Sequence, residues 1–318
     1  MSLAFTQESD FRKEREFGQK ISATFEFIRA HWRPLGRVML YTVLPAALLF
    51  GLINSSMQMA IWGSLARRPV GGGAEVARQQ FAVMGQMFSS PLYWLSAVLG
   101  IMFGSLVVLS VYGYLLCCLR GAAEPGAARS EVTVADVWVI IRREFLSTVL
   151  SIVGIYALTV VGFFLLAIPG IYLSVMLSLF FIVKLVEGTS FGETVSRCWQ
   201  LIQGKWWSTF GLIFVMLLLL YALLALVGIV ASLFGATLLG IVKSGTVQSP
   251  VFAIVSSTLG TGLALLLYPP ILLVLAFQYF NLVERREGVG LRSLVGQLGQ
   301  AAPTARNASY RPEEEGEY

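Results

Sequence analysis

Six long apolar runs dominate the sequence, and no other feature limits its possible folds so strongly. The runs lie at about 38–56, 92–119, 145–167, 169–187, 208–236 and 252–283. A helix needs roughly 20 apolar residues to cross a hydrocarbon layer about 30 Å thick. A chain with 56% hydrophobic and only 13% charged residues cannot hide so much apolar surface in a water-soluble core. The runs therefore predict an all-α, polytopic integral membrane protein with six transmembrane helices.

The distribution of Lys and Arg supports six spans with both termini in the cytoplasm. This arrangement places 19 of these residues in cytoplasmic segments and 4 outside, as the positive-inside rule favours. The run at 207–240 is long enough to hide two short crossings, but a seventh span would move the cations around 285–292 to the outside. The sequence Ile168-Pro169-Gly170 interrupts the block 145–187, which predicts a hairpin with its turn on the outer side.

Three regions follow from this topology. Residues 1–37 are charged and lack a signal-peptide pattern, so we expect no cleavage and a first span that acts as its own signal. They form a cytoplasmic amphipathic helix, because one apolar stripe repeats at spacings of three and four. The stripe consists of Phe17, Ile21, Phe25, Ile28 and Trp32. Residues 38–287 form the membrane domain, and the polar tail 288–318 is expected to be cytoplasmic and largely disordered.

A short pattern recurs just before the first, third and fifth spans. Segments 28–32, 141–145 and 202–206 each read Ile, a long polar residue, two variable positions and an aromatic residue. The chain can thus be divided into three units of interfacial helix plus hairpin, at about 17–119, 131–187 and 190–285. Residues 133–136 and 190–193 resemble capping boxes, which predicts helix starts in the second and third units. The alternative is that any chain re-entering a membrane places an aromatic ring and a cation at the headgroups.

Residues that carry catalysis or bind cofactors lack their usual spacing. His31 is the single histidine, and Cys117, Cys118 and Cys198 have no metal-ligand or disulfide spacing. Nucleotide-binding, metal-binding and nucleophile-elbow motifs are absent from the sequence. We therefore expect no enzymatic activity and no cofactor. We also expect no nucleic-acid partner, since no basic face outside the spans carries interleaved aromatic residues.

Two ionisable residues stand near the cytoplasmic end of the fourth span, where burial of charge is costly. Lys184 and Glu187 are three residues apart, so the simplest interpretation is a helical ion pair with a snorkelling lysine. The functional alternative is a gate or a contact with lipid headgroups.

Small residues and prolines mark two further candidate positions. Gly100 and Gly104 form a small-xxx-small face in the second span, which allows close helix packing within the chain or between protomers. Pro269 and Pro270 interrupt the sixth span and are expected to kink it, or to form a site with the carbonyl groups that the kink frees.

One part of the chain is similar to a known family. The sequences IVKLVEG at 182–188 and ETVSRCWQLIQGKWW at 193–207 are followed by YFNL at 279–282 and RREG at 285–288. This series resembles the membrane domain attached to some bacterial glycerophosphodiester phosphodiesterases. Arg197 and Trp206 lie within this series and are candidate functional or packing residues, and Trp206 is also the aromatic residue that ends the third recurrent segment. It does not imply phosphodiesterase activity, because the chain has no carboxylate and histidine cluster and no soluble barrel.

The sequence favours a non-enzymatic protein of the bacterial cytoplasmic membrane that organises lipids or partner proteins. Membrane lipids are the expected partners, with other proteins or a second copy of the chain as further possibilities. The alternative is a transporter or channel with its site at the kinked sixth span, because internal repeats and broken helices are common in transporters. A third hypothesis, an intramembrane lipid enzyme, requires clustered polar side chains at one depth, which the sequence does not provide.

Overall fold

A computed structural model of the chain describes residues 8–66, 88–123, 132–241 and 268–288, together with a few residues outside these ranges. The described residues form helices and contain no strand. The helices are α1 (Glu8–Phe11), α2 (Phe17–Thr42), α3 (Leu44–Ala66), α5 (Pro91–Ala123), α6 (Val134–Leu165), α7 (Ala167–Leu177), α8 (Phe180–Glu187), α9 (Phe191–Ile202), α10 (Trp206–Ile241) and α12 (Tyr268–Glu287).

Several of these helices are long and apolar enough to cross a membrane. Four segments satisfy this condition, namely Pro91–Ala122, Val134–Leu165, Ala167–Glu187 and Trp206–Leu226. The bent pair of α2 and α3 adds a fifth if it counts as one span. The predicted helical membrane protein is thus confirmed, whereas the count of six spans stays a prediction. Most of the predicted sixth span before Tyr268 lies outside the described residues, as does most of the tail from 289.

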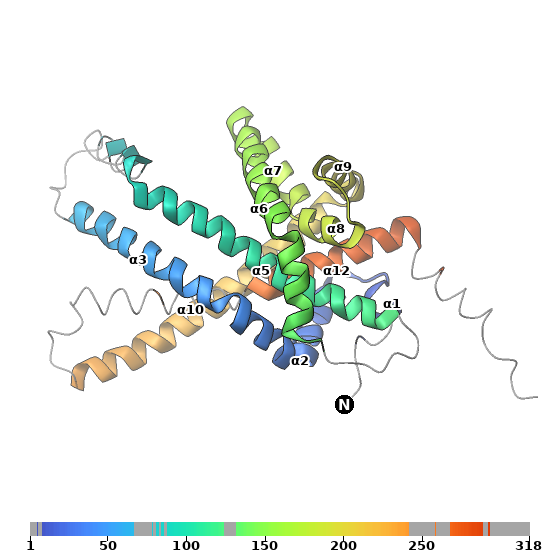
Figure 1. Ribbon diagram of the computed structural model, residues 1–318, viewed down its shortest axis with the longest axis horizontal. Helices are drawn as coiled ribbons and strands as arrows, with labels where there is room; N and C mark the ends of the chain where they lie inside the picture. Colours follow the sequence, from blue (N-terminus) through green and yellow to red (C-terminus); the bar gives the residue numbers. More distant parts are fainter. Residues whose placement is uncertain are drawn as a thin grey trace, which may run out of the picture.

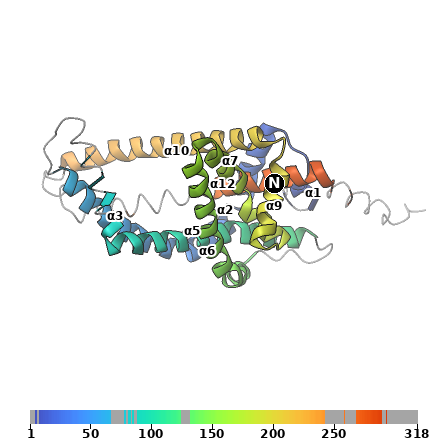
Figure 2. The same ribbon diagram turned by 90° about the horizontal axis from the view of Figure 1, so that it is seen from above.

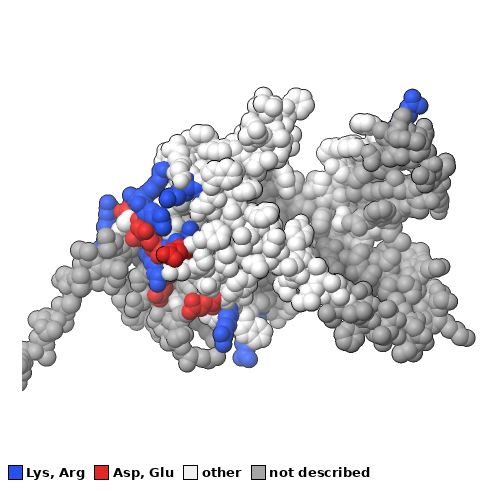
Figure 3. Space-filling model, turned by 180° about the vertical axis from the view of Figure 1, so that it is seen from behind, with Lys and Arg blue, Asp and Glu red and all other residues white. Residues whose placement is uncertain are grey.

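The helices extend in two main directions from a shared centre. In Figures 1 and 2, α3, α5 and α10 extend toward the same end, with α10 apart from α3 and α5, while the α6–α7 hairpin lies across them. Helix α12 lies at the other end, where it packs against α2, α5, α8, α9 and α10. Figure 3 shows acidic and basic side chains gathered at one end of the visible face, with a largely uncharged surface beside them. Two residues in the last turn of α12 form ion pairs with other parts of the chain. These are Arg285 with Glu14 and Glu287 with Arg197.

The predicted hairpin between the third and fourth spans is present. Helix α6 ends at Leu165, Leu166 is extended, and α7 begins at Ala167, so that Pro169 falls in the first turn of α7. A proline is tolerated there because the first backbone N–H groups of a helix have no intrahelical acceptor. The two arms approach closely at Gly162, where an added Cβ would lie 2.7 Å from Leu173 Cδ1 and 3.2 Å from the Gly170 Cα.

The three junctions between interfacial helix and span differ from one another. In α2 the helix is distorted at His31, three residues before Pro34, and the chain then bends by 52° into α3. Helix α6 instead continues without a break through the second junction. Between α9 and α10, Gly204 adopts a positive φ of 72°, which only glycine tolerates easily. The threefold repeat therefore stays a prediction, and the boundary expected at residue 37 falls inside α2.

The predicted capping boxes are confirmed, and a third is added. The Asp136 backbone N–H donates to Thr133 Oγ1 at 3.3 Å, and the Asp136 carboxylate accepts from the Thr133 N–H at 2.9 Å. The corresponding box at the start of α9 joins Ser190 and Glu193. Sequence analysis did not identify the third box, in which the Glu16 N–H donates to the side chain of Gln19 at 3.0 Å before α2.

The predicted apolar stripe of α2 is only partly exposed, because Ile21 and Ile28 pack against the protein core. Phe17, Phe25 and Trp32 are exposed, whereas the buried face carries Lys20 and Phe27. The exposed rings of the stripe suit contact with lipid, and they lie beside the face that packs against the protein.

Candidate functional site

Lys184 does not form the helical ion pair expected from its spacing to Glu187. Its ammonium group reaches from α8 to α6, where it donates to the Ser147 carbonyl at 3.0 Å and the Ser147 hydroxyl at 2.7 Å. A third hydrogen bond goes to Ser151 Oγ at 2.5 Å. An ammonium has three donors, and these acceptors satisfy all of them, so the buried lysine is held by a neighbouring helix. The prediction of a Lys184–Glu187 pair was therefore wrong.

Glu187 instead belongs to a four-residue group, the Arg197 cluster, formed by Arg197, Glu187, Glu287 and Tyr279. Arg197 Nε lies 3.0 and 3.1 Å from the two carboxylate oxygens of Glu187, and its Nη2 donates to Glu287. The Tyr279 hydroxyl donates to Glu187 Oε1 at 3.0 Å. The cluster thus joins α8, α9 and α12 through side chains that are far apart in the sequence.

The electrostatics of the cluster favour the charged form of Arg197. Burial alone would lower the pKa of Arg197, but the hydrogen bonds to Glu287 and Glu187 together raise it above its ordinary value. The Glu187 side chain, 22% exposed, has three hydrogen bonds to its two oxygens. The Arg197 cluster therefore acts as a clamp that holds the amphipathic helix α9 against α8 and α12.

Helix α12 brings polar side chains into the packed centre. Gln278 Nε2 donates to Thr209 Oγ1 of α10 at 2.8 Å, and Asn281 Oδ1 accepts from the Arg15 backbone N–H at 2.8 Å. Gln278 Oε1 is buried and has no hydrogen-bond partner among the described residues. Pro269 and Pro270 lie buried in the first turn of α12, so within the described residues they begin a helix and do not kink one.

The other predicted packing residues contact several helices. A Cβ added to Gly100 would lie 3.3 Å from Phe50 of α3, whereas one added to Gly104 would lie 3.9 Å from Ile152 of α6. The small-xxx-small face therefore contacts two different helices of the same chain. Trp206 lies between Tyr172 and Phe210, with ring centroids 5.7 and 5.2 Å away and nearly parallel planes. Its indole Nε1 also donates to the Tyr172 carbonyl at 3.3 Å.

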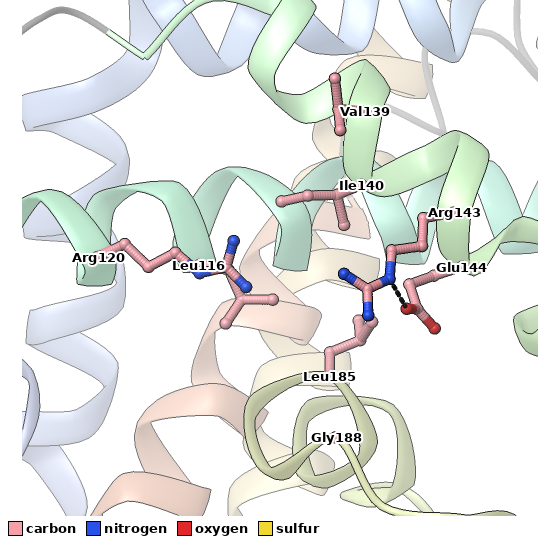
Figure 4. Close-up of a pocket in the computed structure, with 8 residues that line it drawn as sticks. All are labelled: Leu116, Arg120, Val139, Ile140, Arg143, Glu144, Leu185 and Gly188. Carbon is pink, nitrogen blue, oxygen red and sulfur yellow. Dashed lines mark ion pairs between the residues drawn. The ribbon is translucent and has the colours of Figure 1, made fainter.

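Sequence analysis did not identify a cationic cavity between α5, α6 and α8. The cavity has a volume of about 190 Å³ and is lined by Leu116, Arg120, Val139, Ile140, Arg143, Glu144, Leu185 and Gly188. Figure 4 shows the guanidinium groups of Arg120 and Arg143 extending into it from different helices. We call it the Arg120–Arg143 cavity. An apolar groove of about 270 Å³ lies separately between α7 and α10, with Ile171, Ile213 and Phe214 among its lining residues.

Comparisons with known proteins do not assign this site. No family model matches the chain, and neither curated proteins nor solved structures give a significant match. Within the described ranges, no three His, Cys, Asp or Glu side chains are grouped to hold a metal ion. The fold defines the chain as a helical integral membrane protein, and the resemblance to phosphodiesterase membrane domains stays a prediction.

Proposed function

We propose that the chain is a non-enzymatic protein of the bacterial cytoplasmic membrane that organises anionic lipids at its cytoplasmic face. The observation that carries this proposal is the grouping of exposed aromatic rings with Lys205 at the start of α10. Phe17 of α2 lies beside the start of α10, 3.8 Å from a Cβ placed on Gly211. Lys205 immediately precedes α10, and Trp207 in its first turn is 77% exposed.

Exposed aromatic rings and cations have complementary roles at a membrane surface. Aromatic rings favour the headgroup level, and Lys and Arg beside them attract anionic lipids by about 1 kcal/mol per residue near the surface. Phe25 of α2 and Trp199 of α9 are further exposed rings on the two amphipathic helices. Because the Arg197 cluster fixes α9 to α8 and α12, this surface is held in a defined shape. A surface of this kind supports binding of anionic lipids. Partner proteins or a second copy of the chain are further possible ligands of the same surface.

The lipids that remain bound after gentle solubilisation test this proposal. The protein would be extracted with a mild detergent, and its lipids compared by mass spectrometry with those of the whole membrane. An unrelated helical membrane protein purified in parallel controls for nonspecific carry-over. We expect anionic glycerophospholipids to be enriched only with the present chain. A lipid composition equal to that of the control would contradict the proposed function.

A transporter or channel is the second candidate, and buried polar groups on α12 favour it. Gln278 and Asn281 are almost fully buried, and the Gln278 carbonyl oxygen lacks a partner among the described residues. Flux of ions and small solutes through proteoliposomes distinguishes the two functions. The lipid-organising function predicts flux equal to that of empty vesicles, whereas a flux that Gln278→Leu abolishes would favour transport.

A further inference from the structure

We infer that the Arg120–Arg143 cavity binds the phosphate of an anionic glycerophospholipid, with the two arginines as its ligands. This inference rests on the proposed function and assigns it a site and a lipid class. Arg120 projects from the last turn of α5 and Arg143 from α6, and Figure 4 shows both guanidinium groups turned toward the same cavity. Guanidinium groups suit a phosphate because their donors form a planar fork that matches two oxygens.

The charged side chains that line the cavity have a net positive charge that one anion would neutralise. Arg143 Nε lies 3.5 Å from Glu144 Oε1, which offsets one of the two positive charges. Arg120 forms no ion pair with any residue in the described ranges. Lys184 is occupied by the hydroxyl groups of α6 and is not a free ligand. A net charge of about one remains, which matches the single charge of a phosphodiester.

The exposed apolar surface of α6 next to the cavity favours a lipid over a free phosphate as the ligand. Val139, Arg143, Leu146, Leu150 and Val153 follow one another at spacings of four, three, four and three, so they share one face of α6. The apolar members of this stripe are all exposed, with Leu146 at 69% and Leu150 at 63%. A lipid whose phosphate contacts Arg143 can therefore lay its acyl chains along the stripe. Leu116 and Leu185 form an apolar wall inside the cavity, beside the position of the glycerol group.

The neighbouring Arg142 provides a matched control. It has the same chemistry and lies on the same helix, but its guanidinium group stacks on Trp138 at 5.6 Å and does not line the cavity. The test uses the full chain reconstituted in phosphatidylcholine vesicles that contain a minor fraction of phosphatidylglycerol. The measurement is the ratio of phosphatidylglycerol to phosphatidylcholine that co-purifies after mild detergent extraction, determined by mass spectrometry. The variants are Arg120→Gln, Arg143→Gln and Arg142→Gln.

The expected result is a loss of selectivity confined to the cavity variants. Arg120→Gln and Arg143→Gln should each lower the enrichment of phosphatidylglycerol about fivefold, because each removes a charge-assisted hydrogen-bond donor at a partly solvated site. Arg142→Gln should retain the enrichment of the unaltered chain. An excess of soluble glycerol phosphate should not displace the lipid, because it cannot contact the apolar stripe.

The possible failures separate the site from the general function. If the unaltered chain enriches phosphatidylglycerol and all three variants do too, the cavity is not the site, while the proposed function stands. An equal loss in all three variants would also overturn the inference, since it would indicate nonspecific attraction by the charged surface. Displacement by soluble glycerol phosphate would assign the cavity to a free phosphate compound. No enrichment by the unaltered chain would contradict the proposed function itself.

Discussion

Removal of the Arg197 side chain should destabilise the protein more than removal of any exposed arginine. The Arg197 and Glu187 side chains are 23% and 22% exposed, so their hydrogen bonds are only partly screened by solvent. Such charged hydrogen bonds contribute about 1.5–3 kcal/mol, whereas the more exposed contact with Glu287 adds less than about 1 kcal/mol. Arg197→Ala should therefore lower the free energy of unfolding by about 3 kcal/mol. At about 2 °C per kcal/mol for a chain of this size, the melting temperature in detergent should fall by about 6 °C.

Two variants separate this clamp from a general effect of charge. Arg197→Lys keeps the charge but loses the guanidinium fork, so about half of the loss should remain. Arg142→Ala removes an exposed arginine that does not line the Arg120–Arg143 cavity and should change the melting temperature by less than about 1 °C. A double-mutant cycle of Arg197→Ala with Glu187→Gln should give a coupling energy of about 1.5 kcal/mol. A coupling energy near zero, or equal melting temperatures for Arg197→Ala and Arg142→Ala, would refute the reasoning.

Three further outcomes follow from the packing of the helices. Gly162→Ala should destabilise the hairpin by about 1–3 kcal/mol because its Cβ would clash with neighbouring atoms, whereas Gly18→Ala, with no atom within 4 Å, should be neutral or stabilising in a thermal melt. Cys198 is buried and burial raises its pKa to about 12, so in a chain lacking the other two cysteines a maleimide at pH 7 should react only after unfolding. Ser190→Ala should cost about 1 kcal/mol by removing a cap of α9. Because hydrogen bonds from Ser190 lower the pKa of Glu193, stabilisation by this box should persist above the ordinary carboxyl pKa and disappear as pH falls through the lowered value.

The sequence predicted the local structure well because local patterns determine it. The apolar runs and the positions of Thr133 and Ser190 correctly indicated long helices and two helix starts. The break near Pro169 was also predicted, although the extended residue is Leu166. These features depend on residues within one or two helical turns of each other. Periodicity and capping rules describe such interactions directly.

Contacts between distant segments could not be predicted in the same way. Lys184 was paired with Glu187 because they are three residues apart, but its acceptors lie on α6, more than thirty residues earlier in the chain. Likewise, the motif containing Arg197 gave no indication that Glu287 is its partner, 90 residues away. Helical spacing shows which side chains can meet on one helix and says nothing of acceptors that a second helix brings closer.

The sequence also could not predict whether an aromatic side chain at a membrane junction faces lipid or packs against protein. The apolar stripe of α2 correctly predicted an amphipathic helix, yet Trp32 at its end is 62% exposed while Trp206, at the corresponding junction, is packed between two rings. In a membrane both environments favour an aromatic residue, so composition alone cannot distinguish them. The Arg120–Arg143 cavity was missed for a related reason, because its two cations come from different helices.

The most direct test of the account is the side of the membrane on which each end of the molecule lies. Gly85 precedes α5, whereas Gly192 lies in α9, and both have space for a side chain. Gly85→Cys and Gly192→Cys would be made in a chain whose native cysteines are replaced, and intact cells would be treated with a membrane-impermeant maleimide. The account predicts labelling at 85 in intact cells and at 192 only after permeabilisation. Labelling of both positions in intact cells would contradict a topology in which α9 lies on the cytoplasmic side of the membrane and residue 85 on the outer side.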